Sequence, residues 1–332
     1  MNQEKSRVSC GDNLQPAGRE RWLWSEKLLP LLVLFISGCS MIPATVYDKE
    51  HQAVTPGREF VIWMLSDIQP ANKKGREVFE RAIEDVNYHV PDIDLAVMAG
   101  DLLKSRSRSE AFEWFLETRG RSYIRDWYEI AGNHDVRSGE LFWQYIKKPS
   151  HYGVRVGNIL LLLLSDESVA SRTDISDETF AWWRESVIQN QGKIIITITH
   201  APLRHSGLFT SFLASRRIND SPRFEQVLEK YRVAVWGSGH SHLPQGMAGT
   251  ISIQPRLGGT CFINVSAIRE DSFMDSQSRF LIFKEGSDSV WIRSRNHSKN
   301  RFDPGLDVRF KLDKRFVWDG TEPEMVLLPD DM

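Results

Sequence analysis

The sequence contains few cysteines and little net charge, and it has no internal repeat or low-complexity segment. Its three cysteines, Cys10, Cys39 and Cys261, are too few and too far apart for a disulfide framework. The net charge of −2 gives no sign of nucleic-acid binding. With 41% hydrophobic and 26% charged residues, the composition is typical of a folded globular protein. A chain of 332 residues is long enough for one large domain or two small ones.

The N-terminal region lacks an apolar run long enough to cross a membrane. The stretch from Leu28 to Ile36 has about nine residues, whereas a spanning helix needs about 20. It follows Arg19, Arg21 and Lys27 and ends in small residues, which is the layout of a secretory signal. A buried core helix is the alternative, but a proline interrupts the run and Gly-Cys ends it.

Residues 36–39, Ile-Ser-Gly-Cys, also resemble the bacterial lipobox. The resemblance implies a signal peptide over residues 1–38 and lipid attached to Cys39, which would anchor the protein to a membrane of the cell envelope. Ser40 after the cysteine favours the outer membrane. The alternative is a cytosolic enzyme whose N-terminus has been misread.

The body of the chain, from Glu59 onward, alternates apolar runs with helical patterns. The spacing predicts helices over residues 75–88, 110–118, 177–190 and 223–231, and a hairpin over residues 152–164. After His242 the segments alternate apolar and polar residues, as antiparallel strands do. We therefore expect one α/β domain over residues 59–320, with two packed sheets covered by helices on both sides. A tether over residues 39–58 would precede it and a tail over residues 321–332 would follow.

Five apolar runs each end next to residues that can bind a metal ion. The runs are VIWML, LAVMAG, WYEIAG, IIITIT and RVAVWGSG. Such runs are typical of strands buried on both faces, and ligands of open α/β sheets bind outside the carboxyl ends of these strands. The sequence therefore predicts one site that holds two metal ions. The potential ligands at these ends are Asp67 and Gln69, Asp101, the Asn-His-Asp triplet at residues 133–135, His200, and the pair His240 and His242.

Each of these signals has a simpler interpretation when it is taken alone. An Asp at a strand end is often only a helix cap, and Asn-His-Asp at residues 133–135 could form a turn. A single histidine on an apolar strand is more often a hydrogen-bonded core residue. The five blocks nevertheless occur in order, each after a strand, and this conjunction favours a metal site.

In their order and composition the five blocks resemble those of the calcineurin-like metallophosphoesterase superfamily, over about residues 59–245. The resemblance implies a four-layer αββα sandwich of two mixed β-sheets flanked by helices. It also implies a hydrolase of phosphoric esters that uses two divalent ions such as Mn, Fe or Zn.

The resemblance also implies a role for each residue. Asp101 would bridge the two ions, and a hydroxide held between them would attack phosphorus. His134 would act as general acid toward the leaving oxygen, and Asp135 would orient its ring. The first ion would be completed by Asp67, Gln69 and His242, and the second by Asn133, His200 and His240.

Gln69 departs from the usual pattern of the superfamily, which has histidine at this position. An amide oxygen is a weaker ligand for late transition metals than imidazole, so we expect Gln69 to favour harder ions. Arg137, Arg204 and His205 could contact a substrate phosphate, although each is more simply a surface residue. The segment 204–220 is long for a loop and is expected to form one wall of the cleft.

The sequence does not select a substrate, although an open cleft slightly favours diesters or bulky phosphates. The alternative function is a catalytically decayed lipoprotein that binds a ligand on the same scaffold. Against this alternative, Asp101 and His134 are both present and only one ligand position is altered.

Overall fold

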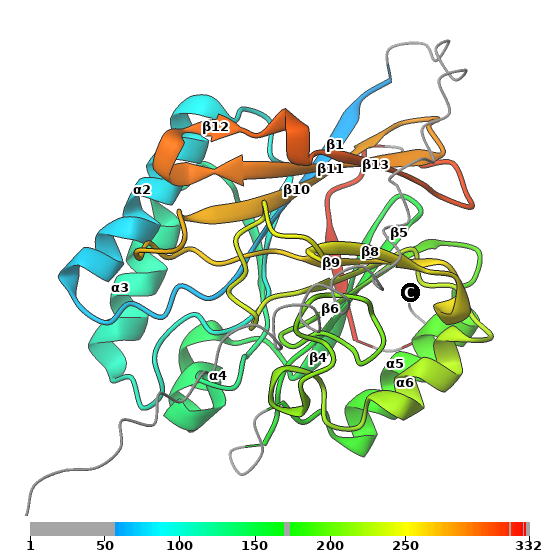
Figure 1. The fold of residues 1–332 in the computed structure, drawn as a ribbon, viewed down its shortest axis with the longest axis horizontal. Coiled ribbons are helices and arrows are strands. Elements are labelled where there is room, and N and C mark those ends of the chain that lie inside the picture. Colours follow the sequence, from blue (N-terminus) through cyan, green and yellow to red (C-terminus); the bar gives the residue numbers. More distant parts are fainter. Residues whose placement is uncertain (1–56, 169–172, 319, 328, 330–332) are drawn as a thin grey trace, which may run out of the picture. The chain divides into compact units, whose positions relative to one another are not determined.

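The computed structural model describes residues 57–168, 173–318, 320–327 and 329 (Figure 1). All of them belong to one unit, Val46–Met332, which is defined by its internal contacts. The expected signal peptide, Cys39 and most of the tether lie outside the described residues. Among the helices of the described part, none combines the length and apolarity that crossing a bilayer requires.

The first sheet is mixed, and its strand order is β12-β11-β10-β1-β2-β3, with β13 also paired to β11. The strands β1, β2 and β3 are parallel, and β10 runs antiparallel to β1. The bounds are β1 Glu59–Leu65, β2 Leu95–Met98, β3 Asp126–Glu129, β10 Gln277–Lys284, β11 Ser289–Asn296, β12 Arg301–Phe302 and β13 Val308–Lys311.

The second sheet is also mixed, and its strand order is β14-β4-β5-β6-β7-β9-β8. The strands β5, β6, β7 and β9 are parallel, while β4 and β5 form the predicted hairpin. The bounds are β4 His151–Val156, β5 Ile159–Leu164, β6 Ile194–Thr199, β7 Val235–Ser238, β8 Ile251–Gln254, β9 Thr260–Asn264 and β14 Glu324–Val326.

Two features of the second sheet differ from the sequence prediction. The strand β9 pairs parallel to β7, although the late strands were expected to be antiparallel. Part of the expected C-terminal tail forms β14, which pairs antiparallel to β4, and Trp182 Nε1 donates to Leu327 O at 2.7 Å. Isolated strands of three to five residues carry little information about their partners, because pairing is decided by contacts distant in the chain.

Helices cover the outer face of each sheet (Figure 1). Apolar residues of α2, α3 and α4 pack with the first sheet, and those of α5 and α6 pack with the second. A third apolar cluster fills the space between the two sheets. The fold is therefore the expected four-layer αββα sandwich. The bounds are α2 Lys73–His89, α3 Ser109–Gly120, α4 Glu140–Ile146, α5 Asp177–Gln189 and α6 Ser221–Leu228.

The sequence of β5, ILLLLL, illustrates why the central strands are continuous apolar runs. Leu161 and Leu163 point into the core between the sheets, and Leu160 and Leu162 point toward the cluster that contains α5 and α6. Successive side chains of a strand alternate between its faces, so a strand covered on both faces needs apolar residues at every position. Such burial fixes the strand, and its carboxyl end is then held in one place.

Candidate metal centre

The parallel strands of both sheets place the predicted ligands at their carboxyl ends. Asp67 and Gln69 follow β1, Asp101 follows β2 and Asn133 follows β3. In the second sheet, His200 follows β6, and β7 leads to the pair His240 and His242. All seven side chains are buried except that of His242, which is one-quarter exposed.

The backbone at this place adopts conformations that non-glycine residues usually avoid. Positive φ angles are found at Asp67 (56°), Gln69 (37°), Asp101 (56°), His240 (61°) and His242 (48°). Such conformations cost of the order of 1 kcal/mol each and persist where the surrounding structure enforces them, often at functional sites. Five of the seven predicted ligands are thus held in unusual backbone geometry.

Two glycines allow the strand ends to approach one another closely. A Cβ atom at Gly132 would collide with the carboxylate of Asp101, and one at Gly239 would collide with Ser66 and with Asp67. The carboxylates therefore occupy space that any other residue would fill.

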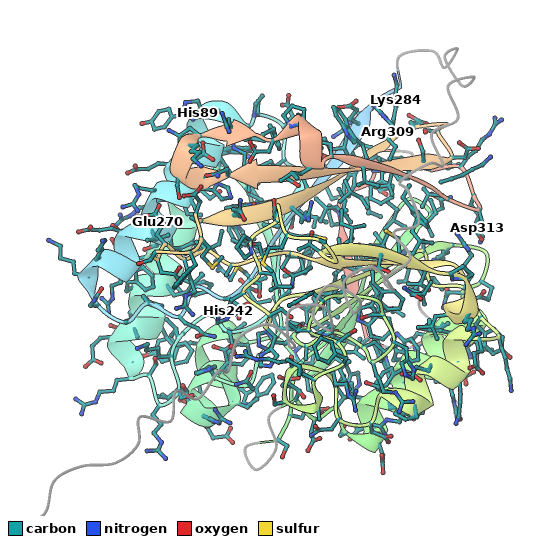
Figure 2. All side chains as sticks on the ribbon, viewed as in Figure 1. His89, His242, Glu270, Lys284, Arg309 and Asp313 are labelled. Atoms are coloured by element: carbon teal, nitrogen blue, oxygen red, sulfur yellow. The ribbon has the colours of Figure 1, made fainter. Side chains whose placement is uncertain are left out.

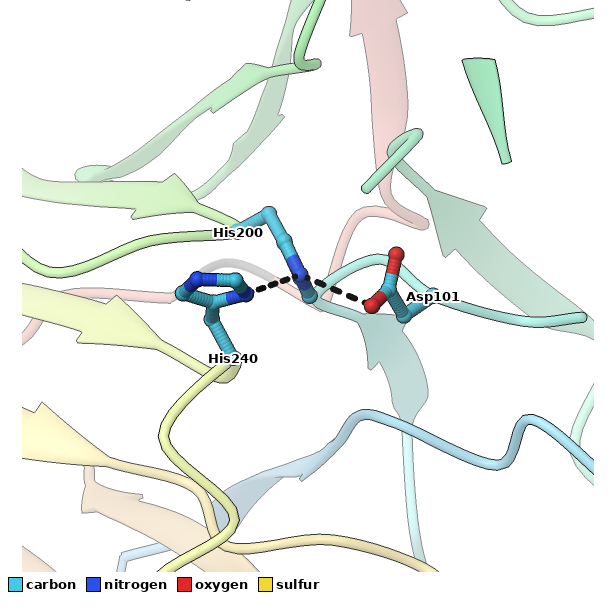
Figure 3. A group of neighbouring side chains, drawn as sticks. All are labelled: Asp101, His200 and His240. Atoms are coloured by element: carbon cyan, nitrogen blue, oxygen red, sulfur yellow. Dashed lines mark hydrogen bonds and ion pairs between the residues drawn. The ribbon is translucent and has the colours of Figure 1, made fainter. Parts of the chain in front are cut away.

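Asp101, His200 and His240 form the centre of the site (Figure 3). One ligand atom from each of them lies within 4.8 Å of the others. His200 Nε2 is 3.2 Å from Asp101 Oδ2, and it is also 3.2 Å from His240 Nδ1. Three potential ligand atoms from two sheets therefore converge on one place.

Hydrogen bonds on the far side of each ring fix which nitrogen can bind a metal. His200 Nδ1 lies 2.8 Å from Ala99 O, and His240 Nε2 lies 3.3 Å from Ser215 O. A carbonyl oxygen only accepts, so these two nitrogens are protonated. His200 Nε2 and His240 Nδ1 are then the nitrogens that face each other and the Asp101 carboxylate. Backbone carbonyls that accept from the outer ring nitrogen in this way orient the histidine ligands of metal sites.

The arrangement fits a divalent cation. The three facing ligand atoms repel one another unless a positive charge lies between them, either a proton on His200 Nε2 or a metal ion in its place. Burial opposes ionisation of His200, yet Asp101 raises the pKa of the His200 ring well above its usual value. The side-chain oxygen Oδ1 of Asn133 is buried and has no hydrogen-bond partner. A buried amide oxygen without a partner is unfavourable unless a ligand satisfies it, and a hard cation would do so.

The other half of the predicted site, Asp67, Gln69 and His242, is connected differently. His242 Nε2 lies 2.8 Å from Asp67 Oδ1, and the amide nitrogen of Gln69 donates to Asp101. Burial raises the pKa of Asp67, but His242 outweighs it and the pKa lies well below its usual value. Rotation of the Gln69 amide by half a turn would present its oxygen instead. These three residues can bind a metal ion if bonds to the ion replace the hydrogen bonds His242–Asp67 and Gln69–Asp101.

His134 lies beside the centre with its ring held by a residue that the sequence did not indicate. Its Nδ1 is 2.9 Å from Ser105 Oγ, and its backbone N–H donates to Asp101 Oδ1 at 2.8 Å. Burial lowers the pKa of His134 below its usual value. The neutral ring is therefore the favoured form near neutral pH.

Asp135 does not orient the His134 ring as expected. Its carboxylate accepts instead from the backbone N–H groups of Gly132 at 2.9 Å and of Leu102 and Leu103 at 3.1 Å. Burial raises the pKa of Asp135 to about 7. Asp135 thus ties the loop after β3 to the loop after β2, and the Ser105 hydroxyl holds the ring.

Several residues near the centre were missed by sequence reasoning. Asp166 follows β5 as the predicted ligands follow their strands, and this signal could have found it. It is buried, its Oδ2 has no hydrogen-bond partner, and burial raises its pKa well above the usual value. Arg269, whose Nη1 is 3.0 Å from His242 Nδ1, and Ser105 lie in loops without a recognisable pattern.

The candidate phosphate contacts on the loop after β6 have other partners. Arg204 forms an ion pair with Glu225 at 2.9 Å, and His205 Nδ1 lies 3.3 Å from the same carboxylate. Further along this loop, Arg216 Nη1 donates to His240 O at 3.2 Å. The loop therefore forms a wall of the site, as expected, through residues 215 and 216 rather than 204 and 205.

Comparison with known families gives a match over most of the domain. The model of the calcineurin-like phosphoesterase family matches residues 60–244, a span that contains all the predicted ligands. A protein of Xenorhabdus bovienii named as a probable cyclic nucleotide phosphodiesterase is 24% identical over 174 residues, which are 50% of this chain and 69% of that protein.

Solved structures with the same fold are distant in sequence. Purple acid phosphatase PPD1 from yellow lupin seeds has a TM-score of 0.57 at 13% identity, covering 77% of this chain and 54% of that chain. The chain thus spans about half the length of the lupin protein. GAP50 of Plasmodium, described as an anchor in the inner membrane complex, has a TM-score of 0.50 at 12% identity, covering 77% and 90%.

Proposed function

The chain belongs to the calcineurin-like phosphoesterase family and is a metal-dependent hydrolase of phosphoric esters, and from this premise we propose that it hydrolyses phosphodiesters with two divalent metal ions. The observation that carries the proposal is the convergence of Asp101, His200 and His240 beside the unpartnered oxygen of Asn133. These groups, provided by both sheets, would hold one ion. Asp101, Asp67, Gln69 and His242 would hold the other.

When bound, the two ions supply Lewis acidity toward the phosphoryl oxygens and activate a water molecule as nucleophile. Ser105 holds the His134 ring at Nδ1, and Nε2 is the nitrogen that would give its proton to the leaving oxygen. The pKa of His134 is lowered by burial, and the negative charge of a bound phosphoester would raise it again. His134 would therefore acquire its acid form when substrate is present.

The relative from Xenorhabdus bovienii supports a diester as substrate, because it is named as a probable cyclic nucleotide phosphodiesterase. The alternative remains a protein that has lost catalysis and binds a ligand on the same scaffold. Retention of His134 and of a ligand set that is altered only at Gln69 supports the enzyme.

The site can be tested with residues 40–332 reconstituted with Mn, Fe or Zn. We expect metal binding and turnover of diesters within a panel of monoesters, diesters and pyrophosphates. Asp101→Asn should lower kcat/KM roughly a thousandfold and reduce the metal content, because a charged ligand is lost.

Asp313→Asn is a matched control, since Asp313 pairs with Arg232 and Lys314 and lies far from His242 in Figure 2. It should leave activity and metal content unchanged. Absence of both metal binding and turnover in the wild-type protein would favour the binding alternative.

We also propose that the protein is attached to the cell envelope by lipid on Cys39, with the outer membrane favoured by Ser40. Labelled fatty acid should be incorporated into the wild-type chain and not into Cys39→Ala. Equal labelling of the two chains, or none, would favour a cytosolic enzyme.

A further inference from the structure

The loop after β6 exposes apolar side chains beside the metal centre. Phe209 is 51% exposed, Phe212 66% and Leu213 42%, and Met247 on the loop after His242 is 41% exposed. The ring centroids of Phe209 and Phe212 lie 6.3 Å apart, edge to face. We call these four residues the apolar rim.

The apolar rim is attached to the residues of the metal centre by hydrogen bonds. Phe209 N donates to Gly249 O at 2.9 Å, which joins the two loops that carry the rim. The hydroxyl of Thr210, the residue next to Phe209, is hydrogen-bonded to that of Ser241. Ser241 stands between the ligands His240 and His242 in the sequence. The rim therefore borders the centre and does not belong to a remote surface.

The loop that carries Phe209 and Phe212 has buried apolar residues of its own, so the exposure of the rim does not result from poor packing of the loop. Leu208 and Ile218, at either end of the same loop, are buried in the cluster that contains α5 and α6. The loop thus has apolar anchors of its own, and Phe209 and Phe212 add nothing to them by facing solvent. Grouped exposed apolar side chains next to a catalytic site usually bind part of a ligand.

Charged, hydroxyl and aromatic groups lie together on the two loops that border the metal centre. Arg216 Nη1 donates to His240 O at 3.2 Å. The hydroxyl of Thr210 is bonded to that of Ser241, and Thr210 stands in the chain between the two phenylalanines of the rim, whose ring centroids lie 6.3 Å apart. A nucleoside phosphodiester carries groups that complement all three kinds: a phosphate, a hydroxyl-bearing sugar and an aromatic base.

We propose that the apolar rim binds the base of a nucleoside phosphodiester, with Phe212 as its principal contact; this inference rests on the proposed function. Aromatic side chains bind bases by stacking and tolerate different bases, because every base has a π face. The hydroxyl pair between the rim and the metal ligands favours a nucleoside over a lipid, whose apolar chains would find polar groups there.

The test compares two diesters that differ only in the base. Adenosine 3′,5′-cyclic phosphate and the 3′,5′-cyclic phosphate of methyl riboside have the same reacting bonds. Phe212→Ala should lower the ratio of their kcat/KM values by about fivefold or more, mainly through KM for the nucleotide. Phe212→Trp should restore the ratio. Tyr88→Ala is the matched control, since Tyr88 is an 81% exposed aromatic residue of α2, and it should leave the ratio unchanged.

Two outcomes would overturn the inference while the proposed function stands. An unchanged ratio in Phe212→Ala, with turnover still dependent on Asp101, would show that the rim does not contact the base. Sedimentation of the Cys39→Ala protein with phosphatidylglycerol vesicles, lost when Phe212→Ala is added at an unchanged ratio, would assign the rim to a lipid surface instead.

If the wild-type protein hydrolysed neither diester, the proposed function would fail. The role of the apolar rim would then be tested by measuring nucleotide binding. Calorimetric titration of the metal-loaded protein with adenosine 3′,5′-cyclic phosphate should then show at least fivefold weaker binding for Phe212→Ala. Equal affinity of the two proteins would overturn the inference.

Discussion

The metal centre and a second buried cluster, formed by Asp85, Arg295 and His297, both place histidine against a carboxylate, but they balance the carboxylate charge differently. In the second cluster Arg295 forms a bidentate ion pair with Asp85, and His297 Nδ1 lies 2.7 Å from the same carboxylate. The carboxylates of Asp67 and Asp101 face histidines instead. The charge of the second cluster is thus balanced by the protein itself.

The second cluster is also fully hydrogen-bonded along a chain of side chains. Trp63 Nε1 lies 2.8 Å from Ser278 Oγ, and Ser278 Oγ lies 2.7 Å from His297 Nε2. Burial raises the pKa of Asp85, but the hydrogen bonds from His297 and Arg295 outweigh it, and the pKa lies below its usual value. A network in which each group has a partner stabilises a fold.

The serine, histidine and aspartate of this network have the hydrogen-bond order of a hydrolase triad, yet they are not positioned for catalysis. Ser278 is fully buried, and its oxygen already accepts from Trp63. A nucleophile needs access to substrate. In the metal centre, by contrast, the Asn133 oxygen has no partner, and His200 Nε2 and His240 Nδ1 face each other.

The largest effect is expected from Asp85→Ala, which removes the carboxylate of the second cluster. It leaves the buried guanidinium of Arg295 without its partner, and the free energy of unfolding should fall by about 3–5 kcal/mol. Urea unfolding measures this change. Glu117→Ala, which removes an exposed ion pair with Arg121, should leave the free energy of unfolding almost unchanged. Equal losses in the two variants would show that the cluster is not a stabilising network.

His134→Asn tests the metal centre, because it removes the proposed general acid without removing a metal ligand. We expect kcat to fall about a hundredfold, most with poor leaving groups, while metal content and the unfolding midpoint stay as in the wild type. Steady-state kinetics and metal analysis give the result. A parallel loss of metal would refute the role of His134 as acid.

The second cluster also predicts how stability depends on pH. Burial lowers the pKa of His297 below 6.5, so the unfolded chain binds a proton at this ring before the folded chain does. The contribution of the neutral ring is complete above about pH 6.5 and is lost as the pH falls toward its folded pKa. The urea midpoint should therefore fall less between about pH 7.5 and 5.5 in His297→Asn than in the wild type. An identical fall in both would exclude His297 as the source.

The smallest effect is expected at Gln69. Gln69→His replaces an amide by an imidazole and should shift the preference of that metal site from Mn toward Zn by about tenfold or less. Competition between the two metals, followed by metal analysis, measures the shift. Unchanged content and preference would show that Gln69 does not contact the ion.

Much of the fold and the ligand set could be predicted from the sequence, because these depend on local patterns. The spacing of apolar residues predicted the helices now seen as α2, α3, α5 and α6, and the central strands appear as continuous apolar runs. The metal ligands directly follow such strands, and the parallel strand ends brought Asp101, His200 and His240 together.

The four-layer class of the fold, the order of the strand ends and the candidate ligands at those ends follow from residues that are adjacent in the chain. The hydrogen-bond partners of these residues depend on the tertiary structure. It paired His134 with Ser105, tied Asp135 to backbone N–H groups and joined Asp85 to a guanidinium 210 residues away. Hydrogen bonds are short and directional, so they depend on which loops the packed sheets bring within about 3 Å of each other, and no local pattern records that.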